Sequence, residues 1–367
     1  MLRTNNFRPI SVLPIISKLL ERHICTQLML YLRSFNLTVS TQSGFRPHHS
    51  TESILIKMTD DWLEAMDQGL YTGAIFLDLR KAFDVVNHDL LIAKLQIYGC
   101  SPSSLLWFKS YLTDRRQCVN LSGTVSNTEV LSSGIPQGSI LGPALFLLFI
   151  NDLPLSWESR NGLFADDATF YASTTTLTDV QLQLQRDLNS TAMWTKEHGM
   201  VAHPEKTKYM VIGTRQKLSR CEECALTLFL DDRKLEQAQE ERLLGLDIDP
   251  TLSWSTHVTN LRKKLLKRVA VLARIKKFLP IKYRIILFNA SIKPILEYCV
   301  SVWASCNAGL LDDIFKVQKR CARLILDAPF QARTLPLFYK LGWLPINHIC
   351  IERRLILFKN NLGRTCS

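Results

Sequence analysis

The sequence predicts a mixed α+β core followed by an all-helical, basic C-terminal module. Apolar runs of strand length alternate with helical periodicity over the first 250 residues, whereas from Trp254 onward the apolar residues recur mostly at helical spacing. The charge changes at the same place: residues 251–367 hold 21 Lys and Arg against 5 Asp and Glu, and residues 1–250 hold 24 against 28. All the excess positive charge therefore lies in the C-terminal third, which is typical of a surface that binds a polyanion such as nucleic acid. A basic surface that only confers solubility is the alternative.

The composition is that of a globular protein. The chain has 367 residues, of which 47% are hydrophobic and 21% charged, which excludes a disordered, collagen-like or low-complexity protein. The longest apolar run, 140–150, is interrupted by Gly142 and Pro143 and is too short to span a bilayer. The N-terminus lacks an apolar signal segment, and the ten cysteines without regular spacing indicate reduced thiols. We expect an intracellular protein, nuclear or cytoplasmic, that is neither secreted nor bound to a membrane; its oligomeric state is not predicted.

Periodicity and turn residues place the elements along the chain. Helices are predicted over 15–32, from Ser50 to Gly69, and over 89–97, 141–150 and 177–198. Strands are predicted over 73–79, 118–121, 125–131 and 209–212, with a further strand pair around Asp166 and Asp167. A loop punctuated by Gly and Pro, 133–138, leads into the most apolar of these helices.

Three carboxylates in apolar surroundings are the first candidates for chemistry. Asp166 and Asp167 lie between apolar segments, and Asp78 follows the apolar run 74–77. A solvated hairpin turn would explain the Asp-Asp pair alone. If the two strands lie side by side, however, the three carboxylates come together and suit two Mg²⁺ ions about 3.5–4 Å apart. Hard oxygen ligands without a neighbouring Cys/His cluster favour Mg²⁺ over Zn²⁺.

The order of the motifs identifies a resemblance to a known family. The segments 76–84 (FLDLRKAFD), 133–143 (SGIPQGSILGP) and 164–167 (FADD) resemble motifs A, B and C of reverse transcriptases, in the form found in non-LTR (LINE-type) retrotransposons near the jockey-like group. Segments 7–11 and 42–47 resemble the two fingers motifs, 203–208 resembles motif D, and 243–247 resembles the primer grip. The tail is similar to the family's thumb through 301–303 and 343–345.

The resemblance implies a right-hand polymerase fold. Residues 1–70 would form part of the fingers, truncated at the N-terminus, and residues 71–250 a palm with an antiparallel sheet and inserted fingers elements. Residues 251–367 would form an all-α basic thumb-like region and C-terminal segment. Because the chain begins almost at the first fingers motif, we expect the upstream fingers and any endonuclease domain to be absent.

The same resemblance implies an RNA-directed DNA polymerase that copies retrotransposon RNA into DNA by two-metal nucleotidyl transfer. Its partners would be an RNA template, a DNA primer and dNTPs, and its cofactor two Mg²⁺ ions, with Mn²⁺ able to substitute. Asp78 and Asp166 would ligate both metals, Asp167 would assist, and the Leu79 carbonyl would complete one coordination sphere. Lys206 would act as a general acid near the pyrophosphate; a surface lysine is the alternative.

Four further residues would contact the incoming nucleotide. Arg8 matches the fingers arginine that neutralises the triphosphate, with a strand-start cap as the alternative. Phe83 would be the steric gate that excludes a ribose hydroxyl, or else an ordinary core phenylalanine. Gln137 and Gly138 would lie beside the nucleotide and the template, and they also fit a simple turn.

Nucleic-acid contacts are expected at three places. Arg46 would touch template phosphate or pair within the fingers, and Leu244 and Gly245 belong to the segment that resembles the primer grip. In the helix that follows, an apolar stripe of Val258, Leu261, Leu265, Val269 and Leu272 is expected to face the core. Lys263, Lys267 and Arg274 fall on another face and would follow a phosphate backbone.

Two other functional classes compete with the polymerase. One is a catalytically inactive nucleic-acid-binding remnant of a retroelement polymerase. The other is a structural or protein-interaction module, which predicts little salt dependence of nucleic-acid binding and is disfavoured by the basic tail. Primer extension that depends on Asp166 and Asp167 separates the polymerase from both.

Overall fold

The computed structural model describes residues 10–220 and 224–365, which form two compact units. The first unit contains residues 10–50, 70–211 and 224–237, and the second contains 51–69, 212–220 and 238–365. The segment 51–69, which the sequence assigned to the same domain as residues 1–50, therefore packs with the C-terminal helices. Arg8 lies outside the described residues.

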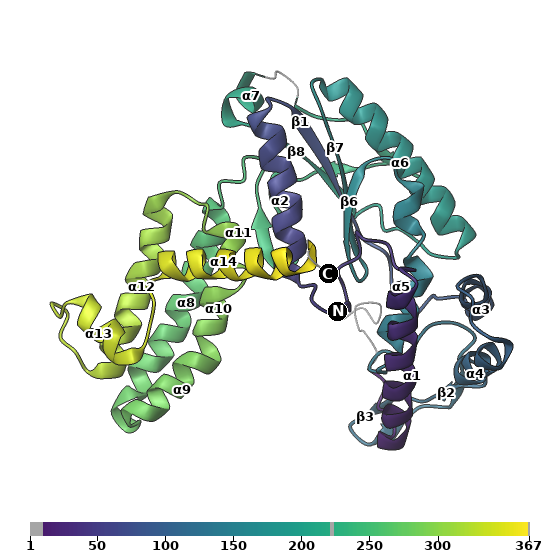
Figure 1. Cartoon of the computed structure of the whole chain (residues 1–367), viewed down its shortest axis with the longest axis horizontal. Helices are drawn as coiled ribbons and strands as arrows, with labels where there is room; N and C mark the ends of the chain where they lie inside the picture. The colour runs from purple at the N-terminus through teal and green to yellow at the C-terminus, as the bar shows by residue number, and fades with distance from the viewer. Residues whose placement is uncertain (1–9, 221–223, 366–367) are drawn as a thin grey trace. The chain divides into compact units, whose positions relative to one another are not determined.

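A five-stranded sheet forms the centre of the first unit, with the strand order β11-β8-β1-β7-β6. Figure 1 labels its strands β8, β1, β7 and β6. Its members are β1 (Tyr71–Leu77), β6 (Arg160–Phe164), β7 (Asp167–Thr174), β8 (Lys208–Ile212) and β11 (Glu236–Gln237). The pairs β1–β7 and β6–β7 are antiparallel, and β11 runs parallel to β8. The mixed helix and sheet composition predicted from the sequence is confirmed.

The register of the sheet fixes the relative positions of the candidate carboxylates. Leu77, the last residue of β1, pairs with Ala168 near the start of β7. Asp78 and Asp167 are the next residues outward from this pair, so the two strands deliver their carboxylates to the same end of the sheet. The strand β1 ends two residues before the predicted boundary at Leu79, which leaves Asp78 just outside the sheet.

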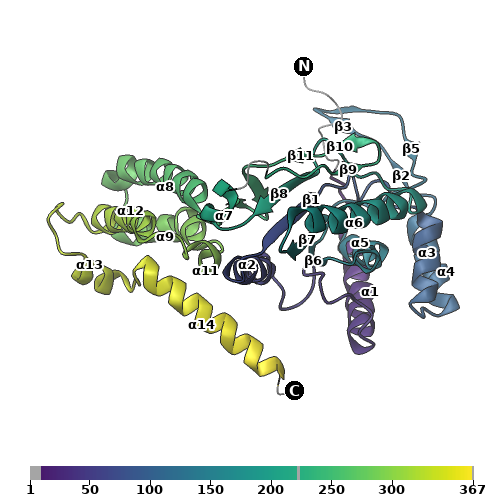
Figure 2. The ribbon, with the colours of Figure 1, turned by 90° about the horizontal axis from the view of Figure 1, so that it is seen from above.

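Helix packing buries most of the two central strands β1 and β7. The long helix α6 (Leu177–Glu197) packs along β1 and β7 (Figure 2). The helix α5 (Gly142–Ile150) buries all of its residues except Pro143, as its apolar composition predicts. The first unit also contains α1 (Ile15–Ser34), α3 (His88–Ile97), α4 (Pro102–Leu112) and the 3₁₀ turn η2 (Leu153–Ser156).

Two local predictions in this unit were wrong or incomplete. Helix α4 was not predicted, although Ser101 caps its N-terminus by accepting a hydrogen bond from the Ser104 N–H and Pro102 occupies its first turn. The two strands predicted over 118–121 and 125–131 are instead two short antiparallel pairs. They join β2 (Arg116–Gln117) to β5 (Glu129–Val130) and β3 (Asn120–Leu121) to β4 (Thr124–Val125). A further short pair joins β9 (Phe229–Leu230) to β10 (Arg233–Lys234).

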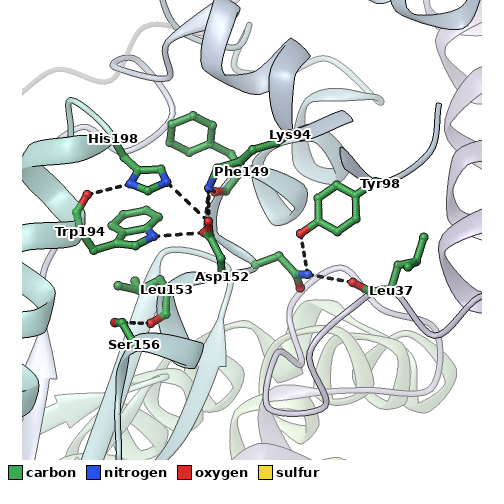
Figure 3. A network of polar contacts seen from close by, with 10 residues as sticks. Leu37, Lys94, Tyr98, Phe149, Asp152, Leu153, Ser156, Trp194 and His198 are labelled. Carbon is green, nitrogen blue, oxygen red and sulfur yellow. Dashed lines mark hydrogen bonds and ion pairs between the residues drawn. The ribbon is translucent and has the colours of Figure 1, made fainter. Parts of the chain in front are cut away.

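A polar network around Asp152 ties α3 to α5 and α6 (Figure 3). The buried Lys94 ammonium donates to both carboxylate oxygens of Asp152, at 2.7 and 2.8 Å, and to the Phe149 carbonyl at 2.5 Å. The Trp194 indole N–H also donates to Asp152, at 3.1 Å, and His198 Nε2 lies 3.5 Å from it. Burial alone would raise the pKa of Asp152, but the hydrogen bonds from His198 and Lys94 lower it to about 2.

The second unit is helical apart from one hairpin among its described residues. Its helices are α2 (Thr51–Asp67), α7 (Arg215–Arg220), α8 (Ser255–Ile275), α9 (Ile281–Ser291), α10 (Lys293–Glu297), α11 (Val300–Trp303), α12 (Ala308–Leu326), α13 (Thr334–Leu341) and α14 (Ile346–Thr365), with the 3₁₀ turn η3 (Lys276–Phe278). Figure 2 shows α8, α9 and α12 packed side by side, and α11 contacts both α2 and α14. The hairpin joins β12 (Glu241–Leu243) to β13 (Leu246–Ile248).

Helix α8 has the two faces that the sequence predicts. All five residues of its apolar stripe are buried, whereas Lys263, Lys267 and Arg274 are exposed; we call these three residues the basic face of α8. Over residues 10–220 and 224–365, no helix has both the length and the apolar content needed to cross a membrane.

Candidate active site

The site is built where β1 ends and the β6–β7 hairpin turns. A cavity of about 540 Å³ opens here within the first unit. Its lining includes seven residues singled out from the sequence: Asp78, Leu79, Phe83, Gln137, Gly138, Asp166 and Lys206. Arg80, Lys81, Ala82, Asp84, Pro136, Ser139, Pro143 and His203 complete the lining. The structure thus brings together residues that lie up to 128 positions apart in the sequence.

Asp78 is held by the loop that resembles motif D. Its N–H donates to the hydroxyl of the fully buried Thr207 at 3.2 Å, and its carbonyl accepts from the His203 N–H at 2.8 Å. The backbone of the site is therefore fixed, while the Asp78 carboxylate remains 43% exposed. The Lys206 ammonium lies 3.9 Å from this carboxylate. Because Lys206 is itself 65% exposed, this pair contributes little to stability, and the lysine is available to move toward a bound anion.

Asp166 occupies the two-residue turn between β6 and β7. Its neighbour Ala165 has φ 58°, a left-handed conformation that is unfavourable for a residue with a Cβ. The surrounding structure compensates through Gln42, whose buried side chain accepts from the Ala165 N–H at 3.1 Å and donates to the Ala165 carbonyl at 3.4 Å. Strained backbone of this kind persists where tertiary contacts hold it, and it is often found at functional sites.

Gly44 lets the loop 42–47 pack directly on this turn. A Cβ at position 44 would lie 2.3 Å from the Ala165 nitrogen, so only glycine fits without displacing the backbone. The Gly44 N–H also donates to the Gln42 side chain at 2.8 Å. Sequence reasoning singled out this loop through its motif, but it did not predict that Gln42 and Gly44 support the Asp166 turn.

Two of the three carboxylates that the sequence predicts as metal ligands line this cavity. Asp78 and Asp166 line the same cavity, whereas Asp167 is exposed and is not among the lining residues. Within the part of the chain that the structure describes, no three His, Cys, Asp or Glu side chains group as a ready-made metal site. Mg²⁺ is commonly held by one or two carboxylates together with substrate phosphates and water, so the pair Asp78 and Asp166 fits this ion.

Phe83 and the loop 136–139 line the same cavity. The Phe83 ring is half-buried and stacks on Phe146 with 4.2 Å between centroids, so it is both a packing residue and a lining residue. Gly138 has φ 103°, and a Cβ there would lie 3.0 Å from the Ser11 carbonyl oxygen. The Gln137 side-chain NH₂ group donates to the Asp84 carboxylate at 2.7 Å, and the Gln137 main-chain carbonyl accepts from the Ser11 N–H at 2.8 Å.

The predicted nucleic-acid contacts lie elsewhere. The Arg46 guanidinium donates to the carbonyls of Val39 and Gln42 at 2.8 and 3.0 Å, which is local pairing of the kind named as the alternative, pairing within the fingers. Burial lowers the pKa of Arg46 from its ordinary value. Leu244 and Gly245 form the turn of the β12–β13 hairpin in the second unit, where the Tyr298 hydroxyl donates to the Leu244 carbonyl at 2.7 Å. Roles of these residues in binding nucleic acid stay predictions.

Comparison with known proteins defines the class. Residues 3–248 match the family described as reverse transcriptase (RNA-dependent DNA polymerase). The chain therefore belongs to the reverse transcriptase family.

Three relatives from Drosophila melanogaster indicate which reverse transcriptases the chain is similar to. The chain is 30% identical to "Probable RNA-directed DNA polymerase from transposon BS", over 89% of this chain and 37% of the relative. It is 27% identical to the X-element counterpart (90% of this chain, 37% of the relative) and 27% identical to the RNA-directed DNA polymerase from mobile element jockey (90% and 36%). The resemblance to polymerases of jockey-like retrotransposons is confirmed, and the chain spans little more than a third of the length of these relatives.

A solved telomerase from Candida albicans, in complex with a fragment of telomeric RNA, is similar at 12% identity. The alignment has a TM-score of 0.49 and covers 88% of this chain and 58% of that chain.

Proposed function

We propose that this chain is the catalytic part of an RNA-directed DNA polymerase that copies retrotransposon RNA into DNA. The observation that supports this most directly is that Asp78 and Asp166 lie at the same end of the central sheet and line one cavity. Membership in the reverse transcriptase family supports the same reaction. In this proposal the first unit, to which the segment 51–69 does not belong, provides the palm and parts of the fingers of a right-hand polymerase fold. The helical C-terminal region serves as the thumb.

Phosphoryl transfer depends mostly on positioning and on stabilising charge, and the cavity residues are suited to both tasks. Asp78, Asp166 and the Leu79 carbonyl would hold two Mg²⁺ ions, or Mn²⁺ in their place, with Asp167 assisting from the adjacent position. The metals would neutralise the triphosphate and lower the pKa of the primer 3′-hydroxyl. Lys206, whose ammonium lies 3.9 Å from the Asp78 carboxylate, would donate a proton to the departing pyrophosphate.

Phe83 and the loop 136–139 would select the nucleotide. The half-buried Phe83 ring presents a flat apolar surface to the cavity, and we propose that it lies beneath the sugar and clashes with a ribose 2′-hydroxyl. The backbone at Gly138 allows close approach of the nucleotide, because no side chain intervenes. Arg8 would neutralise the triphosphate from the fingers, and the primer grip turn and the basic face of α8 would contact the nucleic-acid backbone.

Primer extension with dNTPs on an RNA template–DNA primer duplex tests this proposal. We expect synthesis that requires Mg²⁺ or Mn²⁺ and that falls by at least about a thousandfold in Asp78→Asn and in Asp166→Asn, since each variant removes a charge that stabilises the transition state. Asp167→Asn is the matched variant next to Asp166, and because Asp167 does not line the cavity we expect it to lose less activity. Duplex binding without any extension that responds to these substitutions would instead identify a catalytically inactive remnant.

A further inference from the structure

Glu21 is a buried carboxylate that neither the sequence motifs nor the proposed chemistry explains. It lies on α1, is only 1% exposed, and shares the buried face of that helix with Leu28 and Leu32. A carboxylate at such a position costs stability unless hydrogen bonds satisfy its oxygens. An apolar residue would fill this face of α1 without that cost, so the contacts of Glu21 need an explanation.

The Glu21 carboxylate connects three segments of the first unit. Its Oε2 accepts from the Ile140 N–H at 2.7 Å and lies 3.5 Å from the Leu141 nitrogen. Its Oε1 accepts from the Tyr111 hydroxyl on α4 at 3.1 Å and from the Ser17 hydroxyl at 3.3 Å. Burial, with the Glu21 carboxylate close by, raises the pKa of Tyr111 to about 12, so this phenol keeps its proton and donates. Oε2 therefore binds main-chain nitrogen atoms, whereas Oε1 binds two side-chain hydroxyl groups.

The segment 140–141, which the Glu21 carboxylate binds, directly follows residues that line the cavity. Ile140 follows the residues Pro136–Ser139, all of which line the cavity, and it precedes the N-terminus of α5. The unpaired N–H groups at a helix N-terminus favour a nearby negative charge, so a carboxylate holds this point better than a neutral acceptor. The Ser11 N–H and the Asp84 side chain hold the other end of the loop through Gln137. Glu21 therefore supplies the charged side chain that holds the C-terminal end of the loop 136–139.

We infer that Glu21 is a positioning residue for nucleotide selection: by holding the Ile140 N–H, it sets the position of Gln137 and Gly138 in the cavity wall. The inference rests on the proposed function, because it assigns to this wall the contact with the incoming nucleotide. It predicts that changes at Glu21 act mainly on nucleotide binding, while Asp78 and Asp166, which Glu21 does not contact, continue to support the chemical step.

Four variants separate positioning from general stability. Glu21→Leu removes both acceptors, and Glu21→Asp keeps the charge but withdraws it from Ile140 by one methylene. Glu21→Gln is isosteric, since its amide oxygen can accept from the Ile140 N–H while its NH₂ group donates to Tyr111. Ser17→Ala is the matched control, because it removes a hydrogen bond to the same carboxylate at Oε1 and leaves the Oε2 contact with Ile140 in place.

Steady-state primer extension at saturating template–primer provides the first measurement. We expect the KM for dNTP to rise about tenfold in Glu21→Leu and less in Glu21→Asp, with kcat changed by less than about threefold, the size expected when one charge-assisted hydrogen bond is removed. Glu21→Gln should recover most of the KM effect, and Ser17→Ala should stay within about twofold of the wild type.

Amide hydrogen exchange over residues 137–141 provides a second measurement that needs no activity. Faster exchange in Glu21→Leu and Glu21→Asp, but not in Ser17→Ala, is expected. The inference is overturned if folded Glu21→Leu or Glu21→Asp shows unchanged dNTP KM and unchanged exchange, or if Ser17→Ala has the same effect as they do. A wild-type chain without extension activity would refute the proposed function instead. The exchange data, together with calorimetric dNTP binding, would then decide whether Glu21 positions this loop.

Discussion

Replacing Gly44 by Ala tests whether the loop 42–47 positions the Asp166 turn. The new Cβ would lie 2.3 Å from the Ala165 nitrogen and 3.0 Å from its Cα, whereas ordinary contacts begin at 3.4 Å. The loop and the turn must therefore separate by about 1 Å, because both contacting groups are backbone and neither can rotate away. Such overpacking typically costs about 1–3 kcal/mol of folding free energy. The same shift would lengthen the hydrogen bonds of Gln42 to Ala165.

The effect on synthesis should exceed the effect on stability. A displacement of about 1 Å at a catalytic group costs on the order of a hundredfold in rate, since the reacting atoms leave their productive geometry. We expect Gly44→Ala to unfold at a lower urea concentration than the wild type. At temperatures where it remains folded, we expect its kcat to be reduced about a hundredfold in primer extension. Gly309→Ala is the matched control, because the nearest atom to its Cβ, at 3.3 Å, belongs to the Asn307 side chain and not to backbone.

Two results would contradict this reasoning. If Gly44→Ala keeps wild-type stability and extension rate, the backbone contact with Ala165 is unimportant. If stability falls but the folded variant extends primers at the wild-type rate, the contact supports the fold without positioning Asp166. Circular dichroism in the same buffer as the kinetic assay shows which fraction of the variant is folded.

Three further predictions concern other parts of the chain. Phe83→Val should raise the ratio of kcat/KM for rNTP over dNTP about tenfold or more, and an unchanged ratio would place the sugar gate at another residue. Changing the three residues of the basic face of α8 to Gln should weaken binding to all template–primer sequences alike. The slope of log K against log salt concentration should become shallower by about 0.9 for each phosphate that is no longer neutralised. An unchanged slope would show that this face contacts only water. Asp152→Asn should destabilise the chain at pH 7 by about 1–2 kcal/mol, a value discounted because Asp152 is 41% exposed. The folded-state pKa of Asp152 lies below its ordinary value of 3.8, so its contribution to the free energy of unfolding is present above pH 4 and is lost as the pH falls toward about 2. The urea unfolding curves of wild type and variant should therefore converge at low pH.

Much of the fold could be predicted because its signals are local. The apolar run at 74–77, the period of α6 and the stripe of α8 each reflect burial that a single element requires. The prediction that Asp78 and Asp166 lie near each other needed one further assumption, that the two apolar strands pair. Strands β1 and β7 do pair, and both residues line one cavity. The roles of these carboxylates in catalysis stay predictions.

What sequence reasoning missed depends on contacts between distant segments. Gln42 reaches a residue 123 positions later in the chain, and nothing in its neighbourhood indicates that its amide will hold a left-handed alanine. The different positions of Asp166 and Asp167 are likewise invisible in a dipeptide of identical residues: one lies in the turn and lines the cavity, and the other begins β7. Glu21 gave a weak signal, since it lies seven residues before Leu28 on the face of α1 that is otherwise apolar.

The anchors around the cavity share one arrangement, which explains how so few chemical groups can be placed accurately. The Asp78 backbone is bound by Thr207, the Ala165 turn by Gln42, and the segment after Gly138 by Glu21. Each of these three side chains is buried, and each binds main-chain atoms of a lining residue (Asp78) or of a residue directly next to one (Ala165 and Ile140). Main-chain anchoring leaves the wall side chains free to contact a substrate while their Cα positions stay fixed. If phosphoryl transfer here depends mostly on positioning, these anchors should matter to the reaction rate although none of them lines the cavity.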